Sequence, residues 1–85
     1  MRLDGNAAGG LLSEVLRFDA TVAVCTCAHC GAGEPLAAAH AYMGGPGTVL
    51  RCPHCENVVV RVVRVRDRVL LDTGGVRSLE PAAAV

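Results

Sequence analysis

Two Cys-x-x-Cys pairs constrain the fold of this chain more than any other feature of its sequence. The first is CAHC at residues 27–30, the second is CPHC at residues 52–55, and 21 residues separate them. Cysteines three positions apart on a tight turn can both face one ion, and two such pairs provide the four thiolates of a closed tetrahedral zinc site. The predicted ligands of one Zn²⁺ per chain are Cys27, Cys30, Cys52 and Cys55.

The residues that follow each pair agree with such a turn. A turn of this kind often needs a left-handed backbone position after its second cysteine, which glycine adopts most easily. Gly31 takes that place after the first pair, whereas Glu56 and then Asn57 follow the second pair. We expect Glu56 to tolerate the geometry that Gly31 adopts freely.

Iron and thiol chemistry are alternatives to a structural zinc site. A rubredoxin-like iron electron carrier also uses two Cys-x-x-Cys pairs, but rubredoxins pack an aromatic core around the metal, and this chain has no Trp, one Phe and one Tyr. Cys-Pro-His-Cys is also an active-site sequence of thiol oxidoreductases, where a helix N-terminus lowers the pKa of the first cysteine. Here ENVVVRVVRV follows the second pair, and this pattern predicts a strand. Zinc is therefore preferred.

The length and composition make a metal useful for stability. A chain of 85 residues forms one domain and buries a modest share of its surface. Its apolar residues are mostly Val, Ala and Leu, and aromatic side chains, which contribute the most buried area, are nearly absent. We therefore expect a small, metal-stabilised fold.

The N-terminal sequence predicts a cytoplasmic protein. Ser13, Glu14 and Arg17 interrupt its apolar stretch, so it does not resemble a secretion signal, and no apolar run is long enough to span a membrane. In the cytoplasm thiols stay reduced, and closely spaced cysteines then indicate metal binding or catalysis rather than structural disulfides.

A short helix is predicted over residues 4–17. Asp4 is a suitable N-cap, and Ala8, Leu11 and Val15 recur at helical spacing. Gly9 and Gly10 would weaken this helix, so we expect it to depend on packing against the rest of the domain.

The rest of the chain predicts antiparallel strands. The clearest signal is a hairpin, in which VVVRVVRV and RVLLDT flank a tight turn at Arg66 and Asp67. Gly-Gly-Pro-Gly at residues 44–47 predicts another turn. The predicted strands are residues 20–27, 35–43, 48–52, 58–65 and 68–73, and a flexible tail is predicted over 80–85.

Four residues beside the predicted ligands are candidates for contacts with the metal centre. Cys25 points to the same side of a strand as Cys27, and we interpret it as a small buried residue beside the site. His29 and His54 lie inside the two pairs, where side chains usually point outward. Arg51, next to Cys52, could offset the negative charge of a four-thiolate site.

Charge gives little support for nucleic-acid binding. The formal net charge is zero, and thiolate-bound zinc would make it negative. Arg64 and Arg66 share one face of the predicted hairpin whereas Arg61 lies on the other, and no aromatic platform for bases is present. No catalytic constellation is visible either, so we expect a protein that is not an enzyme.

Several segments resemble a family of small, uncharacterised actinobacterial zinc-ribbon proteins, classed as a domain of unknown function. They are LDGNAAGGLLSEVL, CAHCG, PGTVLRCPHC and RVVRVRDRVLLD, and the resemblance spans nearly the whole chain. It implies a zinc ribbon with the four ligands predicted above and suggests an oxidoreductase as a partner protein. Cys25 does not belong to that pattern.

These observations predict a single zinc-ribbon domain over residues 1–79. An antiparallel sheet at residues 20–73 would carry the two cysteine pairs, and the helix at 4–17 would cover one face. The predicted function is a non-enzymatic accessory module that binds a protein partner. A nucleic-acid-binding zinc ribbon and an iron or thiol redox protein are the alternatives.

Overall fold

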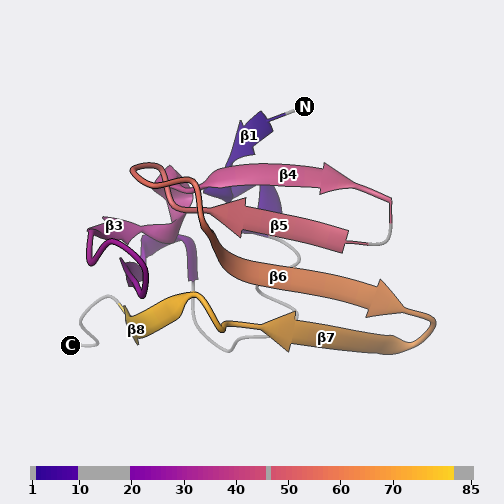
Figure 1. Ribbon diagram of the computed structural model, residues 1–85. Helices are drawn as coiled ribbons and strands as arrows, with labels where there is room; N and C mark the ends of the chain where they lie inside the picture. Colours follow the sequence, from indigo (N-terminus) through magenta and orange to yellow (C-terminus); the bar gives the residue numbers. More distant parts are fainter. Residues whose placement is uncertain (1, 10–19, 46, 82–85) are drawn as a thin grey trace.

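Two antiparallel sheets make up the computed structural model, which describes residues 2–9, 20–45 and 47–81 (Figure 1). The larger sheet has five strands in the order β1-β4-β5-β6-β7, and the smaller has three in the order β3-β2-β8. The strands of the larger sheet are β1 (Arg2–Asp4), β4 (His40–Gly44), β5 (Gly47–Arg51), β6 (Val58–Val65) and β7 (Arg68–Asp72). Those of the smaller sheet are β2 (Val24–Cys27), β3 (Gly33–Pro35) and β8 (Val76–Glu80). The predicted mainly-β, antiparallel architecture is confirmed.

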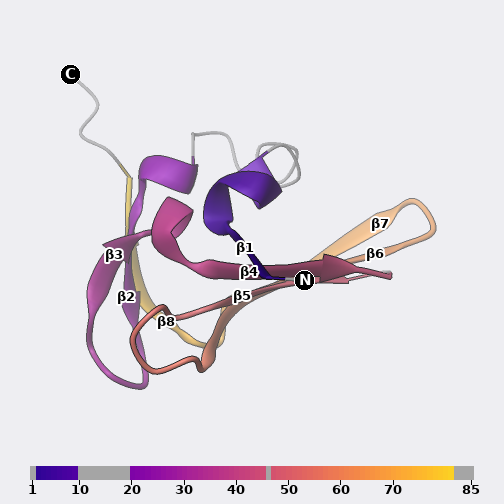
Figure 2. The same cartoon turned by 90° about the horizontal axis from the view of Figure 1, so that it is seen from above.

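Three short 3₁₀ helices complete the described elements: η1 (Gly5–Ala8), η2 (Ala20–Val22) and η3 (Leu36–Ala38). Seen from above, the two sheets meet at a steep angle, and η1 and η3 lie on one face of the larger sheet (Figure 2). No helix among the described residues is long and apolar enough to cross a membrane.

The hairpin of β6 and β7 follows the predicted pattern. The two strands pair from Arg61 opposite Asp72 to Val65 opposite Arg68, which leaves Arg66 and Asp67 as a two-residue turn. Arg66 has a φ of 57°, the left-handed conformation that two-residue hairpin turns require.

The predicted helix over residues 4–17 is wrong where the structure describes it. Residues 2–4 form β1, which pairs with β4 and places Leu3 opposite Ala41. Asp4 does cap the next turn, because its carboxylate accepts a hydrogen bond of 3.0 Å from the Asn6 N–H, but that turn is the 3₁₀ helix η1. Pairing of β1 with β4 thus outweighs the helical spacing of the apolar residues. Residues 10–19 of the predicted helix lie outside the described residues.

Other element boundaries differ from the prediction. The segment predicted as a strand at 20–27 begins with η2. The one at 35–43 begins at the last residue of β3 and continues through η3 before β4 starts at His40. β8 was not predicted, and its last residue, Glu80, falls in the segment predicted as a tail. Residues 82–85 of that tail lie outside the described part.

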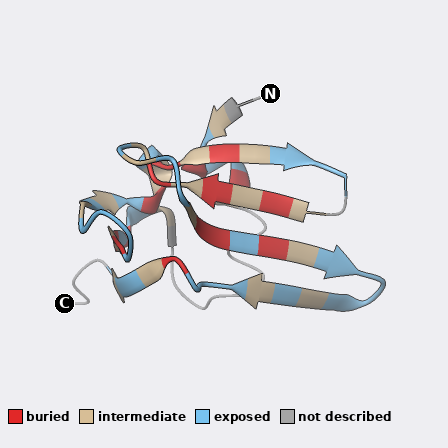
Figure 3. Cartoon of the chain, viewed as in Figure 1, coloured by how far each residue is buried: buried red, intermediate tan, exposed pale blue. Residues whose placement is uncertain are grey.

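The core lies between the face of the larger sheet that carries η1 and η3 and the inner side of β2. Alternate residues of β5 are buried, and across the ladder the buried Leu50 faces Val60 and Thr48 faces Val62 in β6. Figure 3 shows this burial in the middle of the sheet, whereas the far end of the β6–β7 hairpin is exposed. Within the part of the chain that the structure describes, few large side chains are fully buried, chiefly Leu36, Leu50 and Val62.

Candidate metal centre

The first cysteine pair forms a tight turn at the end of β2. The Cys27 N–H donates to the Ala32 carbonyl and the Gly31 N–H donates to the Cys27 carbonyl, both at 2.9 Å. Gly31 has a φ of 80°, the left-handed position expected from the sequence. These bonds fold the backbone back on itself, so that Cys27 and Cys30 face the same side.

The second pair, after β5, repeats the same turn. The Cys52 N–H donates to the Asn57 carbonyl and the Glu56 N–H donates to the Cys52 carbonyl, again at 2.9 Å. Glu56 adopts a φ of 64°, so it tolerates the left-handed position as predicted. We call each of these turns a knuckle: residues 27–32 are the first and residues 52–57 the second.

The two knuckles bring four sulfur atoms into one cluster. All four lie within 4.8 Å of one another, and the Cys27–Cys55 and Cys30–Cys52 Sγ distances are both 3.7 Å. A tetrahedral zinc with Zn–S bonds of about 2.3 Å requires sulfurs about 3.8 Å apart, so these side chains fit a bound ion. Cys27 and Cys52 are buried, Cys55 is half-buried and Cys30 is exposed, which places the centre at the surface of the core.

Hydrogen bonds support the thiolate form of three of these cysteines, Cys27, Cys52 and Cys55. The backbone N–H of His29 donates to Cys27 Sγ and that of His54 donates to Cys52 Sγ, each at 3.4 Å. At Cys55, the backbone and side-chain N–H groups of Asn57 lower the pKa of the thiol to about 6, and the side-chain bond to Sγ measures 3.4 Å. Donors aimed at sulfur stabilise the charged ligands that a metal requires.

The rings of the two histidines inside the knuckles lie outside this cluster. His29 is exposed, and His54 Nε2 lies 2.7 Å from the Glu34 carboxylate, directed away from the sulfurs. Among the described residues, the one group of potential ligands within reach of a common ion consists of the four cysteines. The histidines therefore contact the centre through their backbones.

Arg51 supports the second knuckle from the outside. Its guanidinium donates a 2.8 Å hydrogen bond to the Glu56 carbonyl and lies over the Tyr42 ring, 5.6 Å from its centroid. Compensation of the thiolate charge by Arg51 stays a prediction. The carboxylate of Glu56 in turn lies 2.8 Å from Nδ1 of His40, which belongs to β4.

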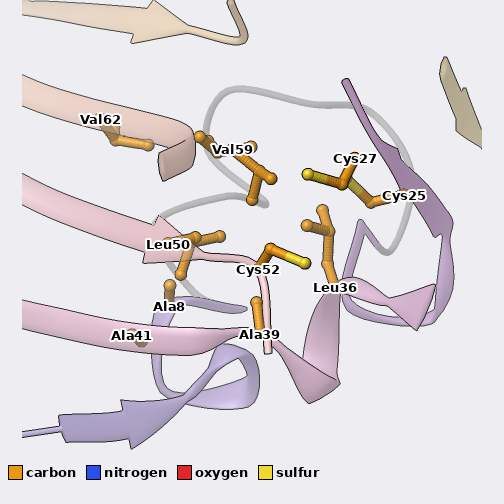
Figure 4. Close-up of a cluster of buried hydrophobic side chains, with 11 residues drawn as sticks. Ala8, Cys25, Cys27, Leu36, Ala39, Ala41, Leu50, Cys52, Val59 and Val62 are labelled. Atoms are coloured by element: carbon orange, nitrogen blue, oxygen red, sulfur yellow. The ribbon is translucent and has the colours of Figure 1, made fainter. Parts of the chain in front are cut away.

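Cys25 lies beside the centre without belonging to it. Its side chain is buried next to Cys27 on β2, and both face Cys52 across the core, with Leu36 and Val59 alongside (Figure 4). Burial, together with the charges of Cys27 and Cys52, raises the pKa of Cys25 to about 11. A neutral thiol in this place acts as a small apolar residue.

The turn between β7 and β8 contributes a contact that the sequence prediction missed. The Ala28 N–H of the first knuckle donates a 2.9 Å hydrogen bond to the carbonyl of Gly75. Gly75 is buried, and a Cβ at this position would overlap the Val58 carbonyl at the start of β6. The only signal in the sequence is the pair Gly74-Gly75, which by itself indicates a turn.

Comparison with known proteins identifies a family without assigning an activity. A family model described as a family of unknown function (DUF6510) matches residues 1–84, so the chain belongs to this family. No curated protein and no solved structure matches the chain.

Proposed function

We propose that this member of the DUF6510 family is a zinc ribbon whose metal is structural. The observation that carries the proposal is the origin of the four sulfurs. Cys27 and Cys30 extend from the smaller sheet, whereas Cys52 and Cys55 connect two strands of the larger sheet. An ion bound by all four would join the two sheets at the edge of the core, and zinc supplies this cross-link without redox chemistry of its own.

Zinc is favoured over iron by the surroundings of the centre. Among the described residues, the side chains packed around it are Val, Leu and Ala, and the single tyrosine contacts Arg51 instead. A rubredoxin-like iron centre would have an aromatic surround.

Metal analysis of the purified chain tests this assignment. We expect one zinc per chain by inductively coupled plasma mass spectrometry, and a colourless protein. Stoichiometric iron with visible thiolate-to-iron absorption would overturn the zinc assignment and favour the electron carrier. A protein without metal that still folds would contradict a metal centre of either kind.

We propose further that the protein is a non-enzymatic accessory module of the cytoplasm that binds a protein partner. A tetrahedral centre with four cysteine ligands has no open coordination position for a substrate. Apolar side chains stay exposed at the same end of the molecule: Val22 at 51 % and Val24 at 40 %. An oxidoreductase is the partner class that we propose.

Affinity capture from the native host tests the accessory role. The variant to compare with the wild-type chain is Val24→Asp, which changes the exposed surface of β2 and leaves the four cysteines intact. We expect the wild-type chain to capture a specific partner that the variant loses while its zinc content stays at one per chain. Equal capture by the wild type and Val24→Asp would show that the partner contacts a surface other than that around Val24. Retention of DNA or RNA that falls steeply with salt would favour the nucleic-acid alternative.

A further inference from the structure

β7 forms one edge of the five-stranded sheet. It pairs with β6 on its inner side, and within residues 2–9, 20–45 and 47–81 no strand pairs with its outer side (Figure 1). An unpaired edge presents free N–H and C=O groups to any strand that approaches it. β7 is five residues long and contains no proline, so each of its residues can take part in backbone pairing.

The sequence of this edge is complementary to itself. Arg68 and Asp72 stand at its two ends, Val69 and Leu71 lie inside them, and Leu70 is central. We propose that two copies of this chain associate through their β7 strands, antiparallel, with the two Leu70 residues facing each other on a two-fold axis. Arg68 of each copy then lies opposite Asp72 of the second copy, and Val69 lies opposite Leu71.

The backbone of β7 suits this register. Val65 and Arg68 close the two-residue hairpin, and in such hairpins the closing pair is hydrogen-bonded. Because hydrogen-bonding groups alternate along a strand, the N–H and C=O groups of Val69 and Leu71 point to the outer side. With Leu70 on the axis, these groups meet their counterparts in the second copy, and the two leucines form the closer, non-hydrogen-bonded pair.

The side chains of β7 also gain from the contact. Leu70 is 51 % exposed and lies opposite Val63 in its own sheet, so a second Leu70 would cover apolar surface that now faces water. Asp72 lies opposite Arg61 on its inner side, and the second copy adds a second cation, Arg68, on its outer side. Direct cross-strand pairs of opposite charge stabilise antiparallel sheets.

Other registers lose these contacts. If the pairing of the two β7 strands shifted by one residue, Leu70 would lie beside a residue whose side chain is on the other face of the sheet. A shift by two residues would place Leu70 opposite Asp72 or opposite Arg68, so that the Arg68–Asp72 pairs and the leucine pair are lost. The five residues therefore specify a single antiparallel arrangement, an isologous contact as expected for a two-fold dimer.

Sedimentation equilibrium of the zinc-loaded full chain over a range of concentrations tests the proposal. Because five residues per strand make a small interface, we expect a weak dimer whose population rises with concentration. Arg68→Asp and Asp72→Arg each replace two attractive pairs with two repulsive ones, and we expect each to weaken the dimer by about tenfold.

Mixing the two variants gives the decisive measurement. In a heterodimer the aspartate introduced by Arg68→Asp faces the arginine introduced by Asp72→Arg, and the native Asp72 of the first chain faces the native Arg68 of the second. Both attractive pairs are thereby restored, so the mixture should associate more tightly than either variant alone. Arg66→Asp makes the same charge change as Arg68→Asp in the neighbouring turn and should leave association unchanged.

Circular dichroism and zinc content show whether each variant folds. If Asp72→Arg fails to fold, Leu70→Asp takes its place, and we expect it to abolish the dimer. A wild-type monomer at all concentrations would overturn the proposal, as would a dimer that neither charge change weakens.

Discussion

Cys25 and Cys27 occupy the same side of β2, two positions apart, and differ in what surrounds their sulfur atoms. Cys27 Sγ accepts the His29 N–H and lies 3.7 Å from Cys55 Sγ, within reach of a shared ion. Cys25 is outside that cluster, and burial favours its neutral thiol. Two cysteines of one strand thus lie in different surroundings, Cys27 within the candidate ligand cluster and Cys25 among packing residues.

Cys25→Ala should therefore retain one metal ion per chain. Removing a buried sulfur costs roughly 1 kcal/mol of stability, similar to the loss of one buried methyl group. Thermal unfolding and metal analysis would check this, with Cys27→Ala as the matched variant that should lose the ion. Loss of metal from Cys25→Ala would show that Cys25 takes part in coordination.

Much of the site could be predicted from individual residues. The spacing of the cysteines brings the four sulfurs together, and the place after each pair indicates the left-handed turns at Gly31 and Glu56. The contact between His54 and Glu34 could not be predicted, because it joins the second knuckle to β3 of the smaller sheet. Local spacing determines a knuckle, whereas contacts between knuckle and sheet depend on the assembled fold.

At the scale of elements, β8 and the turn that precedes it contact both knuckles or the residues next to them. β8 pairs with β2, so that Leu79 lies opposite Cys25, and the turn that precedes it contacts both halves of the centre. The Gly75 carbonyl accepts the Ala28 N–H, and the Gly75 backbone packs against Val58 next to the second knuckle. The strand therefore supports the centre although it contributes no ligand.

Gly75→Ala should destabilise the protein because its methyl group would overlap the Val58 carbonyl, a backbone group that has little room to move. We expect a cost of about 2–3 kcal/mol, as for overpacking in other cores. The matched control is Gly74→Ala, whose methyl group would meet the Asp72 carboxylate at 3.1 Å, a side chain that can rotate away. Thermal unfolding compares the two variants. Equal melting temperatures would show that the backbone of the turn can shift to accommodate the methyl group of Gly75→Ala.

The elements differ in how far the sequence determines them. The β6–β7 hairpin was predicted because its alternation and its two-residue turn are local signals. β8 was missed because VRSLE is short and gains its strand conformation from pairing with β2, about fifty positions earlier in the chain. The predicted helix at 4–17 was wrong at its start for the same reason, because residues 2–4 pair with β4.

At the scale of the whole molecule, two sheets share a thin core. Among the described residues few large side chains are fully buried, and two of the candidate ligands, Cys27 and Cys52, are themselves part of the buried cluster. Small domains with so little buried area need another source of stability. A metal ion held by all four cysteines would stabilise the fold at the edge of this core, where the two sheets meet.

Removal of the metal should consequently unfold both sheets together. Metal binding in small zinc domains contributes about 10–16 kcal/mol to folding, more than the net stability of a typical domain. We expect a strong chelator to abolish the β-sheet signal in far-ultraviolet circular dichroism and added zinc to restore it under reducing conditions. Cys30→Ser, which alters the exposed ligand and leaves the buried core intact, should shift this transition to lower chelator concentrations. An unchanged spectrum after complete removal of the metal would show that the apolar core alone holds the two sheets together.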